Sequence, residues 1–269
     1  MAELTPEQKF QAYYDELVRR VDRLKANLAT AQADLDRVNE AIIEAIKASQ
    51  PPASGWRTIW EPKTINDWSG KVVDAGDVTS PAPGKFRLRV AAPVGGGSHH
   101  CELQQQGLSP RGIEIAYEWI CTILPGSVFP TAPDSTTIHQ SHADNQTGYG
   151  GGILGYRDGR LRLHVRGGKV TDPKGSIHRE YEKDFYLDPF RFQIGVPFTI
   201  RREVKWDAVH GYSRCFINGE KLHEVLDVPT FPAERAEGSM FRVGFYPGDG
   251  EVNPLLDMQV EGLKFQVPA

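Results

Sequence analysis

The feature that most constrains this chain is a seam of apolar residues in its first fifty positions. Its members recur at alternating intervals of four and three: Phe10, Tyr14, Leu17, Val21, Leu24, Leu28, Ala31, Leu35, Val38, Ile42 and Ala45. A narrow stripe of this period, kept for about five heptads, is typical of a helix that winds around a partner helix. A helix that lies on its own domain usually shows a wider stripe of period 3.6, and that alternative stays open.

The residues that flank the seam predict where the helix begins and ends. Thr5 is a suitable N-cap and Pro6 suits the first helical position, whereas Pro51 and Pro52 stop a helix. We therefore expect three parts: a coiled-coil helix over residues 1–50, a linker over 51–56, and a second domain over 57–269. Residues 7–48 are expected to self-associate as a trimer or a dimer, because valine, isoleucine and leucine share the seam.

After the linker the pattern changes to short runs in which apolar and polar residues alternate, as in half-buried strands. The turn signals Asp158-Gly159 and Asn218-Gly219 lie between such runs. Many short strands at regular spacing predict a mainly β fold, a sandwich or jelly roll. The expected strands are Lys85–Val90, Gly112–Ile123, Thr136–His142, Gly152–Tyr156, Arg160–Arg166, Pro197–Val204, Tyr212–Ile217, Ser239–Tyr246 and Gln259–Val267.

Composition and charge exclude several classes of protein. A formal net charge of −4 gives no general attraction to nucleic acid or to an anionic membrane, so neither is expected as a partner. The chain has no run of about 18 apolar residues, and its first thirty positions lack the basic start and apolar run of a signal peptide, so neither a spanning helix nor secretory export is expected. The cysteines Cys101, Cys121 and Cys215 are odd in number and widely spaced, which predicts reduced core residues rather than disulfides.

Basic side chains share one face of an expected strand. In Arg160–Arg166, leucines and a valine occupy one face, while Arg162, His164 and Arg166 occupy the other. Between residues 157 and 179 seven basic residues stand against two acidic ones, a local charge of about +5. This predicts either a groove for an acidic polysaccharide, which arginine can bind through its carboxylates, or a solvated face without a ligand.

A second polar run interrupts the expected strand Thr136–His142. On a strand, Gln140 and His142 share a face and His139 points the opposite way, which argues against a zinc site built from the two histidines. We expect no metal and no cofactor. His142 is expected to titrate near neutral pH, as histidine usually does.

The late run Met240–Tyr246 also separates two faces. Phe241, Val243 and Phe245 share one face, and Arg242, Gly244 and Tyr246 share the other. A glycine inside a strand often marks the close approach of a ligand or another chain. The alternative is a core tyrosine beside a β-bulge.

Over roughly residues 56–267 these motifs resemble the jelly-roll polysaccharide lyases, which include alginate-lyase and heparin-lyase-like families with a concanavalin-A-type sandwich. Gln140–His142 matches their Gln-x-His motif. Met240–Tyr246 follows their strand Tyr-Phe-Lys-Ala-Gly-x-Tyr, with Arg242 in place of lysine, and Phe216–Glu220 looks like their hairpin. Their third motif, Arg-x-Glu-x-Arg, has its best counterpart in His100–Gln104, which keeps the glutamate and lacks both arginines.

The resemblance implies a concanavalin-A-like jelly roll and a set of site residues. It implies that Gln140 holds a substrate carboxylate, that His142 removes the C5 proton and that Tyr246 protonates the leaving oxygen. The expected substrate-binding residues are Glu102, Arg162, His164, Arg166, Arg242 and Asn145.

Three functional hypotheses follow. The leading one is an oligomeric surface protein, similar to bacteriophage tail or fibre proteins, that recognises acidic polysaccharide on the virion surface and contacts other virion proteins. The second is an active polysaccharide lyase that cleaves uronate-containing glycans by β-elimination. The third is a purely structural virion protein.

Overall fold

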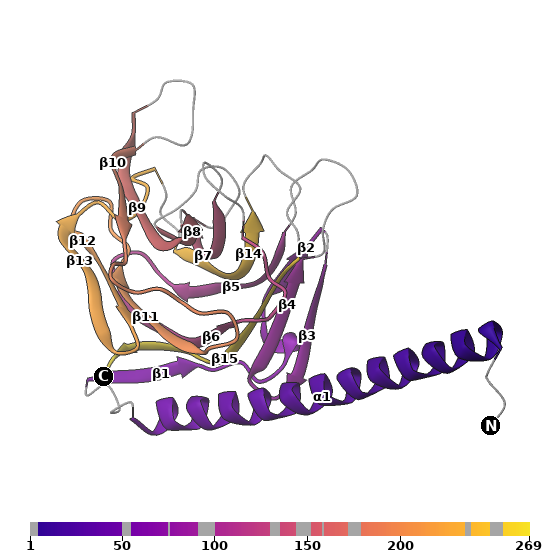
Figure 1. Ribbon diagram of the computed structural model, residues 1–269. Coiled ribbons are helices and arrows are strands. Elements are labelled where there is room, and N and C mark those ends of the chain that lie inside the picture. Colours follow the sequence, from indigo (N-terminus) through magenta and orange to yellow (C-terminus); the bar gives the residue numbers. More distant parts are fainter. Residues whose placement is uncertain are drawn as a thin grey trace. The chain divides into compact units, whose positions relative to one another are not determined.

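The structure is a computed structural model that describes residues 5–49, 55–74, 76–90, 100–129, 135–143, 152–157, 159–171, 179–234, 238–247 and 255–269. The chain divides into two compact units, Met1–Ser49 and Gln50–Ala269. The first unit contains a long helix and the second contains two β-sheets (Figure 1).

The helix α1 runs over Pro6–Ser49, where the seam predicts it. At about 1.5 Å per residue its 44 residues span about 66 Å. The large side chains of the seam are exposed from Phe10 to Val38, with 69% exposure at Phe10, 67% at Leu24 and 70% at Leu28, and Ile42 is half-buried. No helix within the described residues is long and apolar enough to cross a bilayer. The helix is confirmed, and its winding around a partner helix stays a prediction.

Within the described residues, the strands of the second unit form two antiparallel sheets. The eight-stranded sheet has the order β13-β12-β11-β6-β15-β4-β3, with β1 also paired to β15, and the seven-stranded sheet has the order β10-β9-β8-β7-β14-β5-β2. The first sheet contains β1 (Trp56–Trp60), β3 (Asp77–Ala82), β4 (Lys85–Val90), β6 (Glu114–Ile123), β11 (Phe198–Lys205), β12 (Gly211–Ile217), β13 (Glu220–Val228) and β15 (Leu256–Pro268). The second contains β2 (Gly70–Val73), β5 (Cys101–Ser109), β7 (Thr136–Ala143), β8 (Gly152–Arg157), β9 (Arg160–Val170), β10 (Arg179–Tyr186) and β14 (Ser239–Pro247), and a 3₁₀ turn covers Ile65–Asp67.

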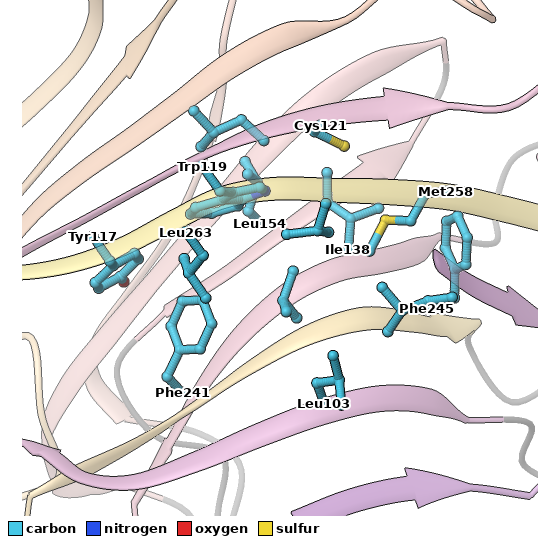
Figure 2. Packing of buried hydrophobic residues seen from close by; sticks show 14 of the residues in the cluster. Leu103, Tyr117, Trp119, Cys121, Ile138, Leu154, Phe241, Phe245, Met258 and Leu263 are labelled. Carbon is cyan, nitrogen blue, oxygen red and sulfur yellow. The ribbon is translucent and has the colours of Figure 1, made fainter. Parts of the chain in front are cut away.

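The predicted sandwich is confirmed, because the inward side chains of both sheets meet in one apolar core. Figure 2 shows Tyr117 and Trp119 of β6 facing Phe241 of β14. The Tyr117 and Phe241 rings lie 5.1 Å apart and nearly perpendicular, a favourable arrangement for aromatic pairs. All nine predicted strands are present, with ends that differ by a few residues.

Two local predictions are also confirmed. Asn218 and Gly219 connect β12 to β13 with φ angles of 51° and 80°, as a tight hairpin turn requires. The three cysteines are free and buried. Of the other predicted turn, Gly159 has a φ of 76° and Asp158 lies outside the described residues.

A polar cluster lies inside the core, on the inward face of β7. The Tyr117 hydroxyl lies 3.2 Å from Nε2 of His139 and 3.3 Å from the hydroxyl of Ser141. Arg202 of β11 is fully buried beside them, where its guanidinium donates to the Ser213 hydroxyl over 3.2 Å. Gly152 leaves room for it, since a Cβ there would lie 2.8 Å from Arg202 Nη2.

Candidate active site on the outer face of the seven-stranded sheet

Strand register aligns several of the predicted site residues in a row across the seven-stranded sheet. Arg242 of β14 pairs with Gln140 of β7 on one side and with Gln104 of β5 on the other. Beyond β7, Gln140 pairs with Ile153 of β8, which in turn pairs with His164 of β9. Because alternate residues of a strand share a face, this row lies on the face that points away from the core.

Three polar side chains of this face are linked by two short hydrogen bonds. Gln140 Nε2 donates to Glu102 Oε1 over 2.6 Å, and Gln140 Oε1 lies 2.7 Å from His142 Nε2. His139 points into the core, so the predicted separation of the faces is confirmed. The sequence predicts that Glu102 binds the sugar directly. Its side chain is 0% exposed, however, so it does not line the surface of the sheet, and its carboxylate contacts Gln140 instead.

The second carboxylate oxygen of Glu102 faces two further side chains. Arg242 Nη1 lies 3.6 Å from Oε2, and His100 Nδ1 lies 3.5 Å from it. The ring of Tyr246 packs on His100 with their centroids 3.9 Å apart. His100, Gln140 of β7 and Arg242 of β14 therefore gather around the buried carboxylate of Glu102 on β5, and Tyr246 packs on the outside of this group against His100.

Burial lowers the pKa of His142 to about 3, and Arg242, Arg166 and His100 act in the same direction. The charged imidazolium is disfavoured both by loss of water and by positive neighbours. The expectation that His142 titrates near neutral pH is therefore wrong. At neutral pH the ring is uncharged and can accept a proton.

The basic face of β9 is neutralised by its neighbour. Asp184 of β10 lies 3.1 Å from Arg162 Nη1 and 2.7 Å from His164 Nδ1, while Glu182 lies 3.3 Å from His164 Nε2. The charge of about +5 over residues 157–179 is correct as a count, but in the folded sheet Glu182 and Asp184, which lie beyond the counted segment, offset it on this face. Arg166 is 6% exposed on the same face, and its charge acts on His142.

Gly244 allows a close approach of two strands. Its φ is 145°, and a Cβ there would lie 2.1 Å from the carbonyl oxygen of Cys101 on β5. The expected approach of a ligand or another chain is thus replaced by an approach within the sheet. The register of β14 against β7 shifts between Val243 and Tyr246, which is the bulge that the alternative interpretation expected.

Two further expectations concern Asn145 and metal binding. Asn145 lies outside the described residues. Within the described part of the chain, no three His, Cys, Asp or Glu side chains are grouped so as to hold a metal ion.

Sequence reasoning missed His100 and Gln104 as members of the site. Both lie where the family motif has its arginines, and both stand beside the residues named above. The motif alignment was the signal that could have found them. A guanidinium does lie beside Glu102, but it belongs to Arg242, which stands where the late strand motif has its lysine.

Residues 51–257 match the family model described as polysaccharide lyase. No curated protein matches the chain in a sequence comparison.

Similar solved structures share the sandwich. They include an endo-β-1,4-glucuronan lyase from the fungus Trichoderma reesei, with 18% identity and a TM-score of 0.61 over 78% of this chain and 95% of that one. An alginate lyase from a Chlorella virus has 12% identity and a TM-score of 0.51 over 74% and 93%. Alginate lyase A1-II′, a member of polysaccharide lyase family 7, has 13% identity and a TM-score of 0.50 over 80% and 96%.

At these identities the structural likeness shows the fold alone. The family model, however, covers more than three quarters of the sequence and includes every strand from β1 to β14. It also spans Glu102, Gln140, His142, Arg242 and Tyr246. The chain therefore belongs to the polysaccharide lyase family.

Proposed function

We propose that this protein binds a uronate-containing polysaccharide on the outer face of its seven-stranded sheet and cleaves it by β-elimination. The observation that carries the proposal is the hydrogen-bonded set of Glu102, Gln140 and His142, with Arg242 in register beside Gln140. Similar folds in a glucuronan lyase and in alginate lyases support a uronate polymer as the substrate class.

In this proposal the groups divide the reaction between them. Arg242 and Gln140 bind the uronate carboxylate, which makes the C5 proton easier to remove. His142 takes that proton, a C4–C5 double bond forms, and the C4–O bond breaks. Tyr246 gives its proton to the leaving oxygen.

The low pKa of His142 fits a base whose strength depends on substrate. In the free protein Arg242 is one of the charges that lower this pKa. A bound carboxylate beside Arg242 offsets that positive charge and raises the proton affinity of His142. The base then becomes stronger when the substrate is in place.

Recognition without cleavage is the second candidate function. It is favoured by the replacement of both motif arginines by His100 and Gln104, since preorganised charge is usually the largest contribution to rate. A surface protein of this kind would bind acidic polysaccharide and release no product.

We further infer that α1 self-associates through residues 7–48 as a trimer or dimer, which the exposed Leu24 and Leu28 support. By analogy with stalked carbohydrate-binding fibres, the proposal includes a place on a bacteriophage virion as a tail or fibre-type protein, in contact with other virion proteins. Antibody against Gln50–Ala269 should then label intact virions, and labelling of free protein alone would contradict this part.

The first experiment is incubation of the full chain with alginates, glucuronans and heparin-type chains, followed by ultraviolet absorbance of the unsaturated product and by pull-down. We expect product from at least one polymer, and a loss of at least about 100-fold in rate in His142→Ala and in Tyr246→Phe. His210→Ala, a change at an exposed histidine, is the matched control.

The outcomes separate the candidates. Binding without product supports recognition alone. Neither binding nor product contradicts both candidates and favours the purely structural virion role.

A further inference from the structure

We propose that Glu102 is a positioning residue that, through the amide of Gln140, fixes His142 as the tautomer with its proton on Nε2. The consequence for catalysis rests on the proposed lyase function. The tautomer itself is a property of the resting protein and does not depend on that function.

The first step concerns the amide of Gln140. An ionised carboxylate can only accept hydrogen bonds, so the Gln140 atom 2.6 Å from Glu102 Oε1 has to be the NH₂ group. The reverse orientation would place the amide oxygen against the carboxylate oxygen at the same distance, and two acceptors repel each other. Glu102 thereby sets which end of the amide faces β5.

The second step concerns the ring of His142. With its NH₂ group towards Glu102, Gln140 presents its oxygen to His142 Nε2 at 2.7 Å. An amide oxygen can only accept, so Nε2 has to carry a proton. A neutral imidazole has one N–H, which leaves Nδ1 as the nitrogen that can accept the substrate proton.

The third step is the fixed position of Glu102. The side chain is 0% exposed, and its strand β5 is paired on both sides, with β14 and with β2. Its second oxygen lies 3.6 Å from Arg242 Nη1 and 3.5 Å from His100 Nδ1. Both carboxylate oxygens therefore face nitrogen atoms. Because Glu102 is held in this place, Oε1 always presents an acceptor to Gln140 and keeps the NH₂ group of the amide turned towards it.

The test is a long-range ¹H–¹⁵N correlation spectrum of the full chain labelled with ¹⁵N-histidine, in which the His142 signals are identified by their absence in His142→Asn. We expect the Nε2–H pattern in the unaltered protein. In Glu102→Gln, the new amide can present either NH₂ or oxygen to Gln140, so we expect the second tautomer to appear. Glu118→Gln, the same change on the outer face of the other sheet, should leave the pattern unchanged.

An Nδ1–H pattern in the unaltered protein would overturn the inference, as would a Glu102→Gln spectrum identical to the original. Should Glu102→Gln not fold, Gln140→Met removes the linking amide and is expected to release the tautomer in the same way. If the lyase function also holds, kcat of Glu102→Gln falls in proportion to the fraction of Nε2–H tautomer lost.

The two proposals fail separately. The expected tautomer without any product contradicts the lyase function and leaves the positioning role standing. Product formation with the opposite tautomer contradicts the positioning role alone.

Discussion

At the scale of single residues, Arg202 is the most unusual feature of the core. It is fully buried, and its Nε and Nη1 atoms have no hydrogen-bond partner among the described residues. A buried cation without a carboxylate partner is costly, because the protein interior does not replace its hydration. The neighbouring rings of Tyr117 and Trp206, 5.7 and 5.9 Å away, compensate only in part.

We therefore predict that Arg202→Met leaves the free energy of unfolding unchanged or raises it by about 1–4 kcal/mol. Equilibrium unfolding in urea measures the change. The control is Arg201→Met, at the next position, where the guanidinium pairs with Glu118 and Glu203 and its loss should destabilise. A large destabilisation by Arg202→Met would mean that this guanidinium has a strong partner.

Buried histidines predict how stability depends on pH. Burial lowers the pKa of His223 to about 4 and of His142 to about 3, and it also lowers the pKa of His139 and of His164. In the unfolded chain a histidine has a pKa near 6.5. Between about pH 6.5 and 4 these histidines therefore bind protons in the unfolded state but stay uncharged in the folded state. As a result, the free energy of unfolding falls as the pH falls.

Replacing one such histidine should flatten this dependence. His223 is 7% exposed and packs against the ring of Phe185 at 4.3 Å, so His223→Phe keeps an aromatic contact. We expect the slope of unfolding free energy between pH 6 and 4.5 to decrease by up to about 1.4 kcal/mol per pH unit. His210→Gln, at a side chain that is 71% exposed, is the control, and equal slopes in His223→Phe and the unaltered chain would contradict the prediction.

At the scale of elements, the contact between β14 and β5 holds the site together. Gly244 permits it, and Gly244→Ala should push the strands apart through the clash with Cys101 and move Arg242 away from Glu102. Overpacking and left-handed backbone each cost about 1–3 kcal/mol. We expect a loss of stability in guanidinium unfolding together with a loss of polysaccharide binding or cleavage.

A glycine on β5 separates the two costs. Gly107 has a φ of 77°, but a Cβ there would meet nothing within 4 Å. Gly107→Ala should therefore show only the backbone cost and keep the site intact. If Gly107→Ala were as damaging as Gly244→Ala, the clash would not be the cause.

The elements also show how far the sequence alone predicts this fold. Strand β4, and β9 as far as Val165, alternate between core and outer face, so their pattern predicts them. The strands β10 and β13 lie at sheet edges and carry polar residues on both faces, which leaves little alternation to detect. In β5, the consecutive glutamines and Gly107 interrupt the alternation of apolar and polar residues, so the inward positions of Cys101 and Leu103 cannot be recognised from the sequence.

For the site, the sequence predicts which residues of one strand share a face, but not which residues of different strands come into contact. Period-two spacing places Gln140 and His142 on one face, and the structure agrees. The contact of Glu102 with Gln140 depends instead on β14 pairing with both β7 and β5, and no local pattern carries that order. For the same reason the acidic residues of β10, which neutralise Arg162, escaped a count taken along the chain.

At the scale of the whole molecule, the proposed self-association of α1 would set how many sandwiches act together. The seam of α1 exposes large apolar side chains from Phe10 to Val38, and burying them against another copy is the favourable outcome in water. We predict that Leu24→Lys, which places a charge in the seam, converts the oligomer to single chains while the sandwich stays folded. Light scattering gives the mass, and circular dichroism follows the fold.

Ala26→Lys is the matched control, because it introduces the same charge two residues away, outside the seam. An unaltered protein that already has the mass of one chain, or a Leu24→Lys variant whose mass does not change, would contradict self-association.

The proposed self-association predicts a further effect on the binding of a repeating polymer. Several linked sites bind one polysaccharide with an avidity that can exceed the single-site affinity by about 10²–10⁴, provided that the sites reach the polymer together. Leu24→Lys should therefore weaken retention on immobilised polysaccharide, whereas binding of a short oligosaccharide, which fills one site, should not change. If both ligands were weakened equally, the substitution would have damaged the site itself, and if neither were weakened, the sandwiches would act independently.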